Sequence, residues 1–267
     1  MTLFCLAGST SASPLVVYSE DYVSGPSNGN HRLDCTIIRP WDSSTGPGNS
    51  LYPVIVWANG WGGNDVVGAY TTDWYKPILI EWALDGPYIV VAANQWSVQE
   101  SDVLACLQWI LEQNELTGSE YQGVVNMAKI GLAGHSQGGG AVVKAGDGEP
   151  KGFDITTVVA MNPYGPSWVD AASQDGPVMV LTGSEDKVTP LFWTYPVFEA
   201  VQTNDQGGLF AILLGAGHND VELYQPVVKL WWQFTLYEDA GAGKRLQRIL
   251  DNDPWDTQYA FTEEFDF

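Results

Sequence analysis

Short runs of hydrophobic residues alternate with segments of helical spacing along most of the chain. A run of roughly four to eight such residues, bounded by Gly, Pro, Asn or Asp, indicates a β-strand. Eight segments fit this pattern: 15–23, 33–39, 53–58, 88–92, 130–133, 156–161, 177–182 and 209–214. The turn-rich stretch between the first two predicts an antiparallel hairpin. The third is apolar throughout, which is typical of a strand covered on both faces.

Helical spacing or composition marks four segments: 74–84, 101–114, 139–145 and 225–237. In the clearest of them, Ser101 is the expected N-cap and Asp102 suits the first turn. One face of that helix carries Val103, Leu104, Leu107, Ile110 and Leu111. The alternation of strands and helices predicts an α/β fold with an eight-stranded, mostly parallel sheet, an antiparallel first strand and helices on both faces.

No internal repeat and no long linker divides the chain, so we predict one α/β domain at 14–250. Residues 1–13 are expected to be disordered or the remnant of a signal peptide, because their apolar stretch is short and no basic residue precedes it. Residues 251–267 are interpreted as an acidic C-terminal tail. Only about fifteen residues separate the sixth and seventh strands, so we expect no large lid.

Acidic residues dominate the charge of the chain, with 32 Asp and Glu against 11 Lys and Arg and a formal net charge of −21. Nucleic acids and anionic membranes attract basic surfaces, so neither is an expected partner. The apolar runs are far shorter than the roughly 20 residues that span a bilayer. The acidic, Lys-poor composition and the short apolar N-terminus favour a secreted or extracellular protein, which we expect to be a monomer.

Three cysteines, Cys5, Cys35 and Cys106, form no metal-binding motif. Cys106 lies within a helical pattern and is expected to be a small buried hydrophobic residue. A Cys5–Cys35 pair stays open as an alternative. The odd number of cysteines argues against a disulfide framework.

The sequence GHSQG at 134–138 stands between the fifth strand and the helix-forming segment 139–145. In this context G-x-S-x-G indicates a nucleophile elbow, a tight strand-to-helix turn that exposes the serine hydroxyl. Glycine on both sides lets the neighbouring backbones approach closely. The alternative is a glycine-rich loop with an incidental serine. We predict that Ser136 is a nucleophile.

A nucleophilic serine needs a general base, and the chain contains three histidines: His31, His135 and His218. His31 falls in the predicted hairpin turn. His135 adjoins Ser136, but neighbours on a tight turn point apart, so it is expected to line the cleft or to pack beside it. His218 follows the eighth strand, at the sheet edge where catalytic groups of α/β proteins gather. We predict His218 as the base.

The orienting acid should lie between the serine and the histidine in chain order. Asp186, just after the seventh strand, is the predicted acid. Its neighbour Glu185 is the rival and is expected to be solvated. Asp220 lies close to the base in sequence and stays open, whereas Asp154 and Asp175 precede strands and belong at the opposite edge.

Two backbone N–H groups should stabilise the oxyanion: that of Gln137, after the nucleophile, and that of Trp61, after the third strand. Trp61 and Tyr164 are also predicted to line the cleft, with Trp96 and Trp168 as weaker candidates. An open cleft edged by aromatic rings suits an aryl or long-acyl ester. This chemistry requires no metal and no cofactor.

Together these segments resemble the α/β-hydrolase family of bacterial cutinase-like polyesterases, which includes poly(ethylene terephthalate) hydrolases, and more distantly the dienelactone-hydrolase-like esterases. The resemblance spans roughly residues 50–240 and rests on 134–140, 59–61, 162–164, 183–190, 214–218 and 230–232. It implies the α/β-hydrolase fold and the triad Ser136, Asp186 and His218. It also implies Trp61 and Gln137 as oxyanion donors and Tyr164 as an aromatic subsite.

The chain departs from the pattern of that family in four places: Gln137 replaces Met, Trp61 replaces Tyr, Tyr164 replaces Trp, and a cysteine pair near the C-terminus is missing. The first three departures lie in the substrate cleft. None of these changes touches the predicted triad. The sequence therefore predicts a serine ester hydrolase, with polyester hydrolysis as a further hypothesis. A lipase, thioesterase or peptidase on the same scaffold, and a non-catalytic binding protein, are the alternatives.

Overall fold

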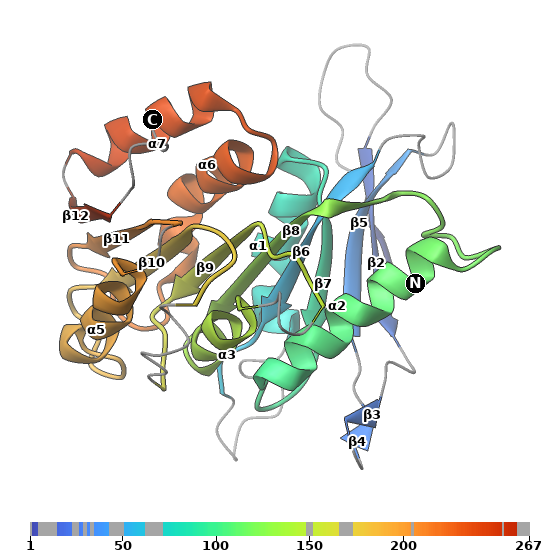
Figure 1. Cartoon of the computed structure of the whole chain (residues 1–267), viewed down its shortest axis with the longest axis horizontal. Helices are drawn as coiled ribbons and strands as arrows, with labels where there is room; N and C mark the ends of the chain where they lie inside the picture. The colour runs from blue at the N-terminus through green and yellow to red at the C-terminus, as the bar shows by residue number, and fades with distance from the viewer. Residues whose placement is uncertain are drawn as a thin grey trace.

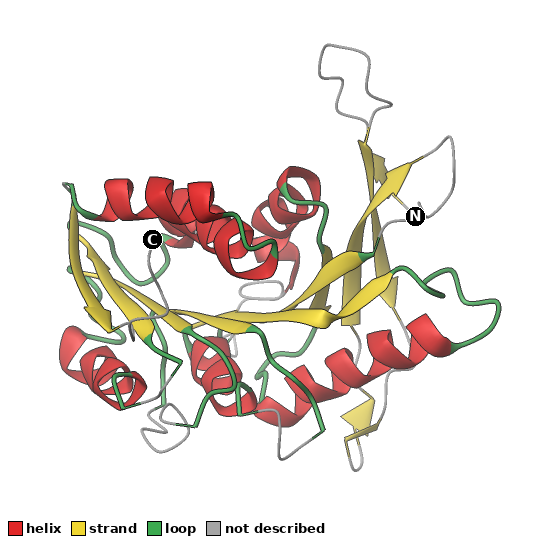
Figure 2. Ribbon diagram, turned by 45° about the horizontal axis from the view of Figure 1, so that its top comes forward, coloured by secondary structure: helices red, strands yellow, loops and turns green. Residues whose placement is uncertain are grey.

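The computed structural model describes residues 2–4, 15–22, 27–28, 31–32, 35–42, 51–61, 72–147, 152–165, 173–203, 206–252 and 254–260. Their main feature is a ten-stranded sheet with helices on both faces (Figures 1 and 2). Its strands, in spatial order, are β1 (Thr2–Phe4), β2 (Leu15–Tyr22), β5 (Cys35–Asp42), β7 (Ile89–Ala93), β6 (Tyr52–Ala58), β8 (Val125–His135), β9 (Thr157–Met161), β10 (Val178–Gly183), β11 (Gly208–Leu213) and β12 (Trp255–Ala260).

The six strands from β7 to β11 run parallel, and β1, β2, β5 and β12 are antiparallel to their neighbours. All eight predicted strands are present, and the predicted first hairpin is the β2–β5 pair. A two-stranded hairpin, β3 (Ser27–Asn28) and β4 (His31–Arg32), interrupts it and contains His31. The mostly parallel α/β fold is thus confirmed.

The predicted number of strands was wrong because both sheet edges carry an extra antiparallel strand. Residues 2–4 pair with β2, so the expectation of a disordered segment does not hold for this part of 1–13. Residues 255–260 pair with β11 over six positions, so 251–267 is not simply a tail. Residues 2–4 are too few to show a strand pattern, whereas Trp255, Thr257 and Tyr259 alternate with polar residues as in a strand. Pairing with an existing edge supplies the hydrogen bonds that local sequence does not predict.

Two layers of helices cover the sheet, one on each face (Figures 1 and 2). One layer contains α2 (Glu100–Glu115), α3 (Gln137–Ala145) and α5 (Leu191–Val201). The other contains α1 (Thr72–Asp85), α6 (Gln225–Leu236) and α7 (Ala240–Leu250). Helices α5 and α7 were not predicted. Pro196 interrupts the pattern of the first, and two glycines weaken that of the second.

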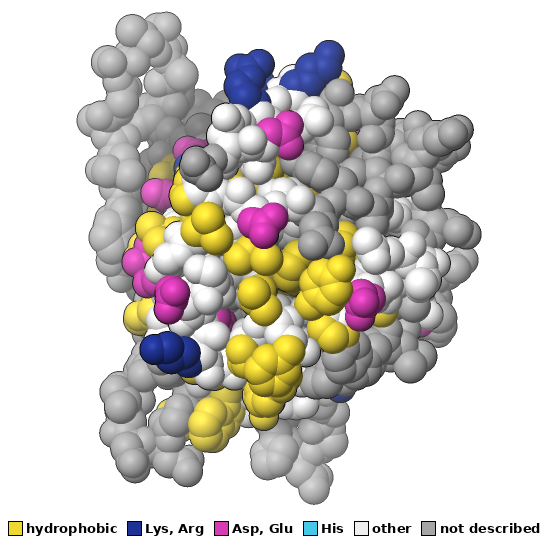
Figure 3. All heavy atoms as spheres, turned by 90° about the vertical axis from the view of Figure 1, so that its left-hand side faces the viewer, with side chains coloured by type: hydrophobic (Ala, Val, Ile, Leu, Met, Phe, Trp, Pro, Cys, Tyr) yellow, Lys and Arg dark blue, Asp and Glu magenta, His cyan; other side chains and the backbone are white. Residues whose placement is uncertain are grey.

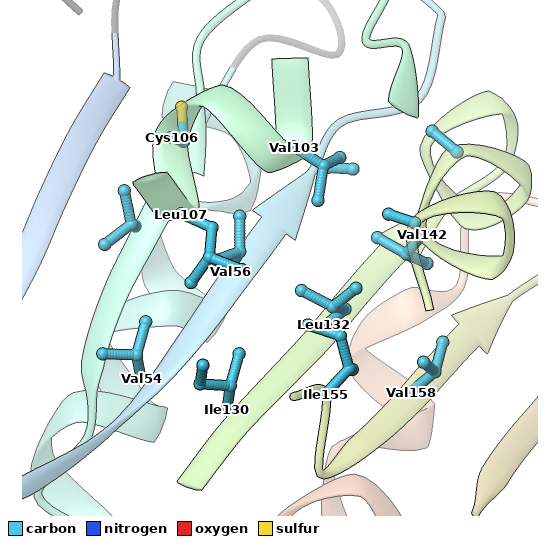
Figure 4. Close-up of a cluster of buried hydrophobic side chains, with 14 of the residues drawn as sticks. Val54, Val56, Val103, Cys106, Leu107, Ile130, Leu132, Val142, Ile155 and Val158 are labelled. Atoms are coloured by element: carbon cyan, nitrogen blue, oxygen red, sulfur yellow. The ribbon is translucent and has the colours of Figure 1, made fainter. Parts of the chain in front are cut away.

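Strand β6 shows how the continuous apolar runs serve both layers at once. Val54, Val56 and Ala58 face α2 and α3, whereas Ile55 and Trp57 face α1 and α6. This division follows from the two-residue period of a strand. Figure 4 shows the first of these cores, where aliphatic side chains from β6, β8, α2 and α3 meet.

A disulfide joins Cys35 of β5 to Cys106 of α2 across a sequence separation of 71 residues. Cys106 is buried, as expected, but it is disulfide-bonded, and the alternative Cys5–Cys35 pair was wrong. Cys5 itself lies outside the described residues. Because β5 pairs with β7 and α2 packs on β7, only the assembled sheet brings the two sulfur atoms together.

The start of α2 differs in detail from the prediction. Its N-cap is Gln99, and Ser101 lies inside the helix. The Asp102 carboxylate accepts a hydrogen bond from the Gln99 N–H at 2.9 Å, so the first-turn role predicted for Asp102 is retained. None of the described helices is long and apolar enough to cross a membrane.

The end of the molecule that carries α5, α7, β11 and β12 is shown in Figure 3. Hydrophobic side chains gather near the centre of this face, with separate acidic side chains around them. Leu214 and Leu223, which follow β11, are each about half exposed at 50% and 51%. The negative charge of the chain therefore does not exclude apolar patches from this surface.

Candidate active site

Ser136 occupies the predicted turn between β8 and α3, with φ 55° and ψ −120°. A left-handed φ is uncommon for a residue with a side chain and marks a strained turn. A Cβ on Gly134 would lie 2.4 Å from the Gly138 carbonyl oxygen, and one on Gly138 would lie 2.2 Å from the Ala58 carbonyl oxygen. Both flanking glycines are therefore required by the close approach of neighbouring backbone.

Three side chains from three loops meet at the carboxyl edge of the parallel strands. His218 Nε2 lies 3.0 Å from the Ser136 hydroxyl, and His218 Nδ1 lies 2.8 Å from Asp186 Oδ2. Ser136 follows β8, Asp186 follows β10, and His218 follows β11. These contacts join the three residues predicted as nucleophile, base and acid into one hydrogen-bonded relay.

Asp186 is buried and held by several donors besides His218. Its Oδ1 accepts from the backbone N–H groups of Val188 and Thr189, each at 2.8 Å, and its Oδ2 accepts from the Thr189 hydroxyl at 2.7 Å. Burial raises the pKa of the Asp186 carboxyl, but the hydrogen bonds from His218 and Thr189 outweigh it and hold the pKa below its usual value. Asp186 therefore stays ionised beside the imidazole.

The rival acids lie elsewhere. Glu185 is exposed, as expected. Asp220 Oδ2 accepts from the Gly217 N–H at 2.7 Å and so supports its own loop. Asp175 accepts from the Ile155 N–H, and with Asp154 it lines a hollow near the amino ends of β9 and β10. None of these carboxylates contacts the relay.

The two residues predicted as oxyanion donors flank the nucleophile. Gln137 begins α3, and its side-chain amide donates to the Ser97 hydroxyl at 2.8 Å. Trp61 follows β6, and its side chain is 55% exposed. The preceding Gly60 N–H donates to the Tyr75 hydroxyl at 3.2 Å and is thereby engaged. Trp61 is the next residue of this loop with an N–H.

The relay opens into a cleft of about 1320 Å³. Trp61, Tyr164 and Val188 contribute exposed apolar surface to it, and the first turns of α2 form a further wall. Trp193 of α5 packs edge-on against Tyr164, with ring centroids 5.5 Å apart at 63°. Aromatic surface therefore continues from the cleft wall onto α5.

The other residues predicted at the cleft are Trp96, Trp168 and His135. Trp96 is 37% exposed but is not among the described residues that line the cleft. Trp168 lies outside the described residues. His135 borders the cleft, but its side chain is completely buried and both of its ring nitrogens are hydrogen-bonded. The expectation that His135 lines the cleft or packs beside it thus agrees with its position, but neither ring nitrogen is available to a ligand.

Sequence reasoning missed three residues that hold the relay: Tyr75, Asn162 and Thr189. Asn162 has φ 45°, and its side-chain amide donates to the His218 carbonyl oxygen at 2.8 Å. Its position directly after a strand, before a proline, was a usable signal. Tyr75 lies within a helix and carried no such signal. In the described part of the chain, no group of three or more His, Cys, Asp or Glu residues could hold a metal ion.

The model of one protein family, PETase (PET hydrolase-like), matches residues 86–223, just over half of the chain. The matched segment includes all three residues of the relay and ends before α6. Among curated proteins, no sequence matches the chain significantly.

Proposed function

Because the chain belongs to the PETase family of PET hydrolase-like proteins, we propose that it is a serine ester hydrolase working through an acyl-enzyme. The single observation that carries the proposal is the Asp186–His218–Ser136 relay, with its contacts of 2.8 Å and 3.0 Å. The family match supports an ester hydrolase of the polyesterase or esterase type. The serine mechanism and the identity of the substrate go beyond what the family match supports.

In the first half-reaction, the Ser136 hydroxyl oxygen attacks the ester carbonyl carbon while His218 Nε2 takes the hydroxyl proton. The carbonyl π electrons move onto oxygen, and the backbone N–H groups of Trp61 and Gln137 stabilise the oxyanion. Ionised Asp186 holds the Nδ1–H of the imidazolium. Collapse of the intermediate breaks the bond to the alkoxy oxygen, which leaves as the alcohol with the proton from Nε2.

In the second half-reaction, water repeats these steps on the acyl-enzyme. His218 Nε2 takes a proton from the water as its oxygen attacks the acyl carbon, and the same two N–H groups receive the oxyanion. The bond to Ser136 then breaks, and its oxygen regains the proton from Nε2. The carboxylic acid leaves and the free enzyme is restored.

Polyester hydrolysis is the finer part of the proposal. The open cleft and the exposed rings of Trp61, Tyr164 and Trp193 support an aromatic or long-chain substrate. If the enzyme cleaves short esters but releases no soluble product from a polyester film, the polyester part of the proposal is wrong and the esterase part stands.

The decisive variant is Ser136→Ala. We expect turnover of a p-nitrophenyl ester to fall by about 10⁴-fold or more, because the nucleophile is lost. A fluorophosphonate probe should label the wild type at Ser136 and leave the variant unlabelled. Ser119→Ala is the matched control, since Ser119 lies beyond α2 and outside the described cleft wall. Retained turnover in Ser136→Ala would refute the proposal.

A lipase, a thioesterase and a peptidase would share this relay, so a panel of acyl-chain lengths, thioesters and amides separates them. The preferred substrate is the one with the highest kcat/KM. A non-catalytic binding protein would bind esters without turnover and would not react with the fluorophosphonate.

A further inference from the structure

We propose that Tyr75 and His135 are positioning residues. They hold the oxyanion loop, residues 59–61 after β6, and the base loop, residues 214–218 after β11, in one relative geometry. Neither residue touches the reacting atoms. Each is completely buried beneath the cleft, and together they connect the loop after β6 with the loop after β11. The inference rests on the proposed function, since it concerns how the Ser136–His218 pair and the oxyanion donors are held.

The hydrogen bonds of the pair run in one direction. His135 Nε2 lies 2.7 Å from the His218 carbonyl oxygen, which can only accept, so Nε2 carries a proton. His135 Nδ1 lies 2.6 Å from the Tyr75 hydroxyl. In neutral imidazole Nδ1 is then the acceptor, and the single Tyr75 proton is donated to it. The Tyr75 oxygen in turn accepts from the Gly60 N–H at 3.2 Å.

This chain of donors requires a neutral His135. Burial, followed by the charge of neighbouring His218, lowers the pKa of His135 to about 3. The backbone hydrogen bond to His218 and the charge of Asp186 act in the opposite direction without reversing it. His135 therefore has one tautomer with one donor and one acceptor, and both are used.

The oxyanion loop rests directly on the pair. A Cβ on Gly60 would lie 2.9 Å from the Tyr75 hydroxyl oxygen, 3.1 Å from His135 Nδ1 and 3.3 Å from the Ser136 Cβ. No larger residue fits at Gly60 unless the pair or the nucleophile moves. Because Tyr75 engages the Gly60 N–H, the loop is oriented so that the next N–H, that of Trp61, remains for the oxyanion.

The base loop is held at the same time from below. The His218 carbonyl oxygen accepts from His135 Nε2 at 2.7 Å and from Asn162 Nδ2 at 2.8 Å. Fixing this carbonyl fixes the backbone from which the His218 imidazole reaches Ser136. The pair therefore couples the position of the base to that of the oxyanion donor.

Tyr75→Phe tests the coupling, because it keeps the ring contacts with Trp57 and His135 and removes only the hydroxyl. We expect kcat to fall about 10- to 100-fold with KM within about two-fold, as for a misplacement of catalytic groups. The rate of Ser136 phosphonylation should fall in parallel. Active-site titration expresses both rates per intact site. A kcat within two-fold of the wild type would overturn the proposal.

Tyr237→Phe is the matched control. It removes a tyrosine hydroxyl that donates to the Gly86 carbonyl oxygen at 2.5 Å, before the amino end of β7. We expect kcat to stay unchanged in this variant. A fall in kcat per intact site as large as that in Tyr75→Phe would show a general stability effect and would contradict the positioning role.

Two further measurements keep the proposal falsifiable if Tyr75→Phe does not fold. The ¹⁵N shifts of wild-type His135 should show the neutral Nε2–H tautomer at pH 7, and an Nδ1–H tautomer or an imidazolium would overturn it. His135→Gln retains a donor for the His218 carbonyl, so it should keep more activity per site than His135→Leu. Equal losses of activity in these two variants would also contradict the positioning role. Loss of activity in Ser136→Ala separately shows that the proposed function itself stands.

Discussion

The two helical layers of this protein have different chemistry. The aliphatic layer, between the sheet and α2, α3 and α5, is built mainly from Val, Leu and Ile (Figure 4). It also includes the Cys35–Cys106 disulfide. The aromatic layer, between the sheet and α1, α6 and α7, contains fully buried large rings: Trp57, Tyr75, Trp82, Tyr88, Tyr224, Trp231 and Trp232. Both exclude water, but only the second brings many polar hydrogens into the core.

Buried indole and phenol groups usually find hydrogen-bond partners. Five of these seven rings do, whereas the Tyr88 hydroxyl and Trp232 Nε1 have none among the described residues. Trp231 Nε1 donates to the Thr157 hydroxyl and Trp82 Nε1 to the Gln225 side chain. Two tyrosines instead reach the residues beneath the relay, Tyr75 at His135 and Tyr224 at Asn162. The aliphatic layer therefore supplies cohesion, whereas the aromatic layer also holds the loops that carry Gly60 and His218.

The largest expected effect on stability comes from the aliphatic layer. Replacing both cysteines, Cys35→Ala with Cys106→Ala, removes a cross-link over 71 residues and should lower the free energy of unfolding by roughly 4 kcal/mol. Because the disulfide does not contact the relay, kcat of the folded variant should stay within two-fold. Denaturant unfolding and ester kinetics measure the two quantities.

Reducing agent serves as the internal check on this variant. It should destabilise the wild type and leave the double alanine variant unaffected. A large fall in kcat of the folded variant would show that the aliphatic layer also sets the geometry of the site, and the comparison would fail.

The next effect concerns pH and the aromatic layer. The pKa of His135 is about 3 in the folded protein against 6.5 as its ordinary value, so the unfolded chain binds the extra proton between these values. The contribution of neutral His135 to the free energy of unfolding is complete above pH 6.5. It is lost as the pH falls toward 3, by about 1.4 kcal/mol per pH unit. His135→Gln removes the titrating group, so its unfolding free energy should fall less steeply between pH 6 and pH 4.

The measurement is the difference between wild type and His135→Gln in urea unfolding at each pH, because the many carboxylates titrate in both proteins. Identical pH slopes would mean that His135 is protonated in the fold or exposed to water, contrary to its buried position. Either result would also weaken the contrast between the two layers.

The smallest expected effect is that of Tyr224→Phe. Its hydroxyl donates to Asn162 Oδ1 at 3.1 Å, but the same oxygen also accepts from the Gly183 N–H at 3.1 Å. Because Asn162 keeps one donor, we expect a loss of about 1 kcal/mol in stability. The change in kcat should be clearly smaller than in Tyr75→Phe. Thermal unfolding and initial rates test this, and an effect on kcat equal to that of Tyr75→Phe would place the control of the base loop at Asn162.

Much of the fold could be read from the chain because buried parallel strands leave a local signature. The continuous apolar segments at 53–58 and 177–182 predicted β6 and β10. The GHSQG turn could be predicted because its glycines are required by close steric contacts with neighbouring elements. Asp186 and His218 were predicted from their order after Ser136 in the chain and from their positions directly after parallel strands.

Other features carried no local signal. Helix α7 forms by packing on α6 despite its glycines. The Cys35–Cys106 pair depends on a strand order that places β5 beside β7. Adjacency to Ser136 placed His135 at the cleft but did not reveal that its ring nitrogens bond Tyr75 and the His218 carbonyl.

Local patterns in the chain specify the strand–helix alternation, the strained serine turn and the order of Ser136, Asp186 and His218. These depend on interactions within a few residues or on the polarity of a parallel sheet. Packing between distant elements is what lets Tyr75 and His135 join two loops beneath the cleft and lets two cysteines cross-link the aliphatic layer. Such contacts depend on distances between elements far apart in the chain, which local composition does not encode.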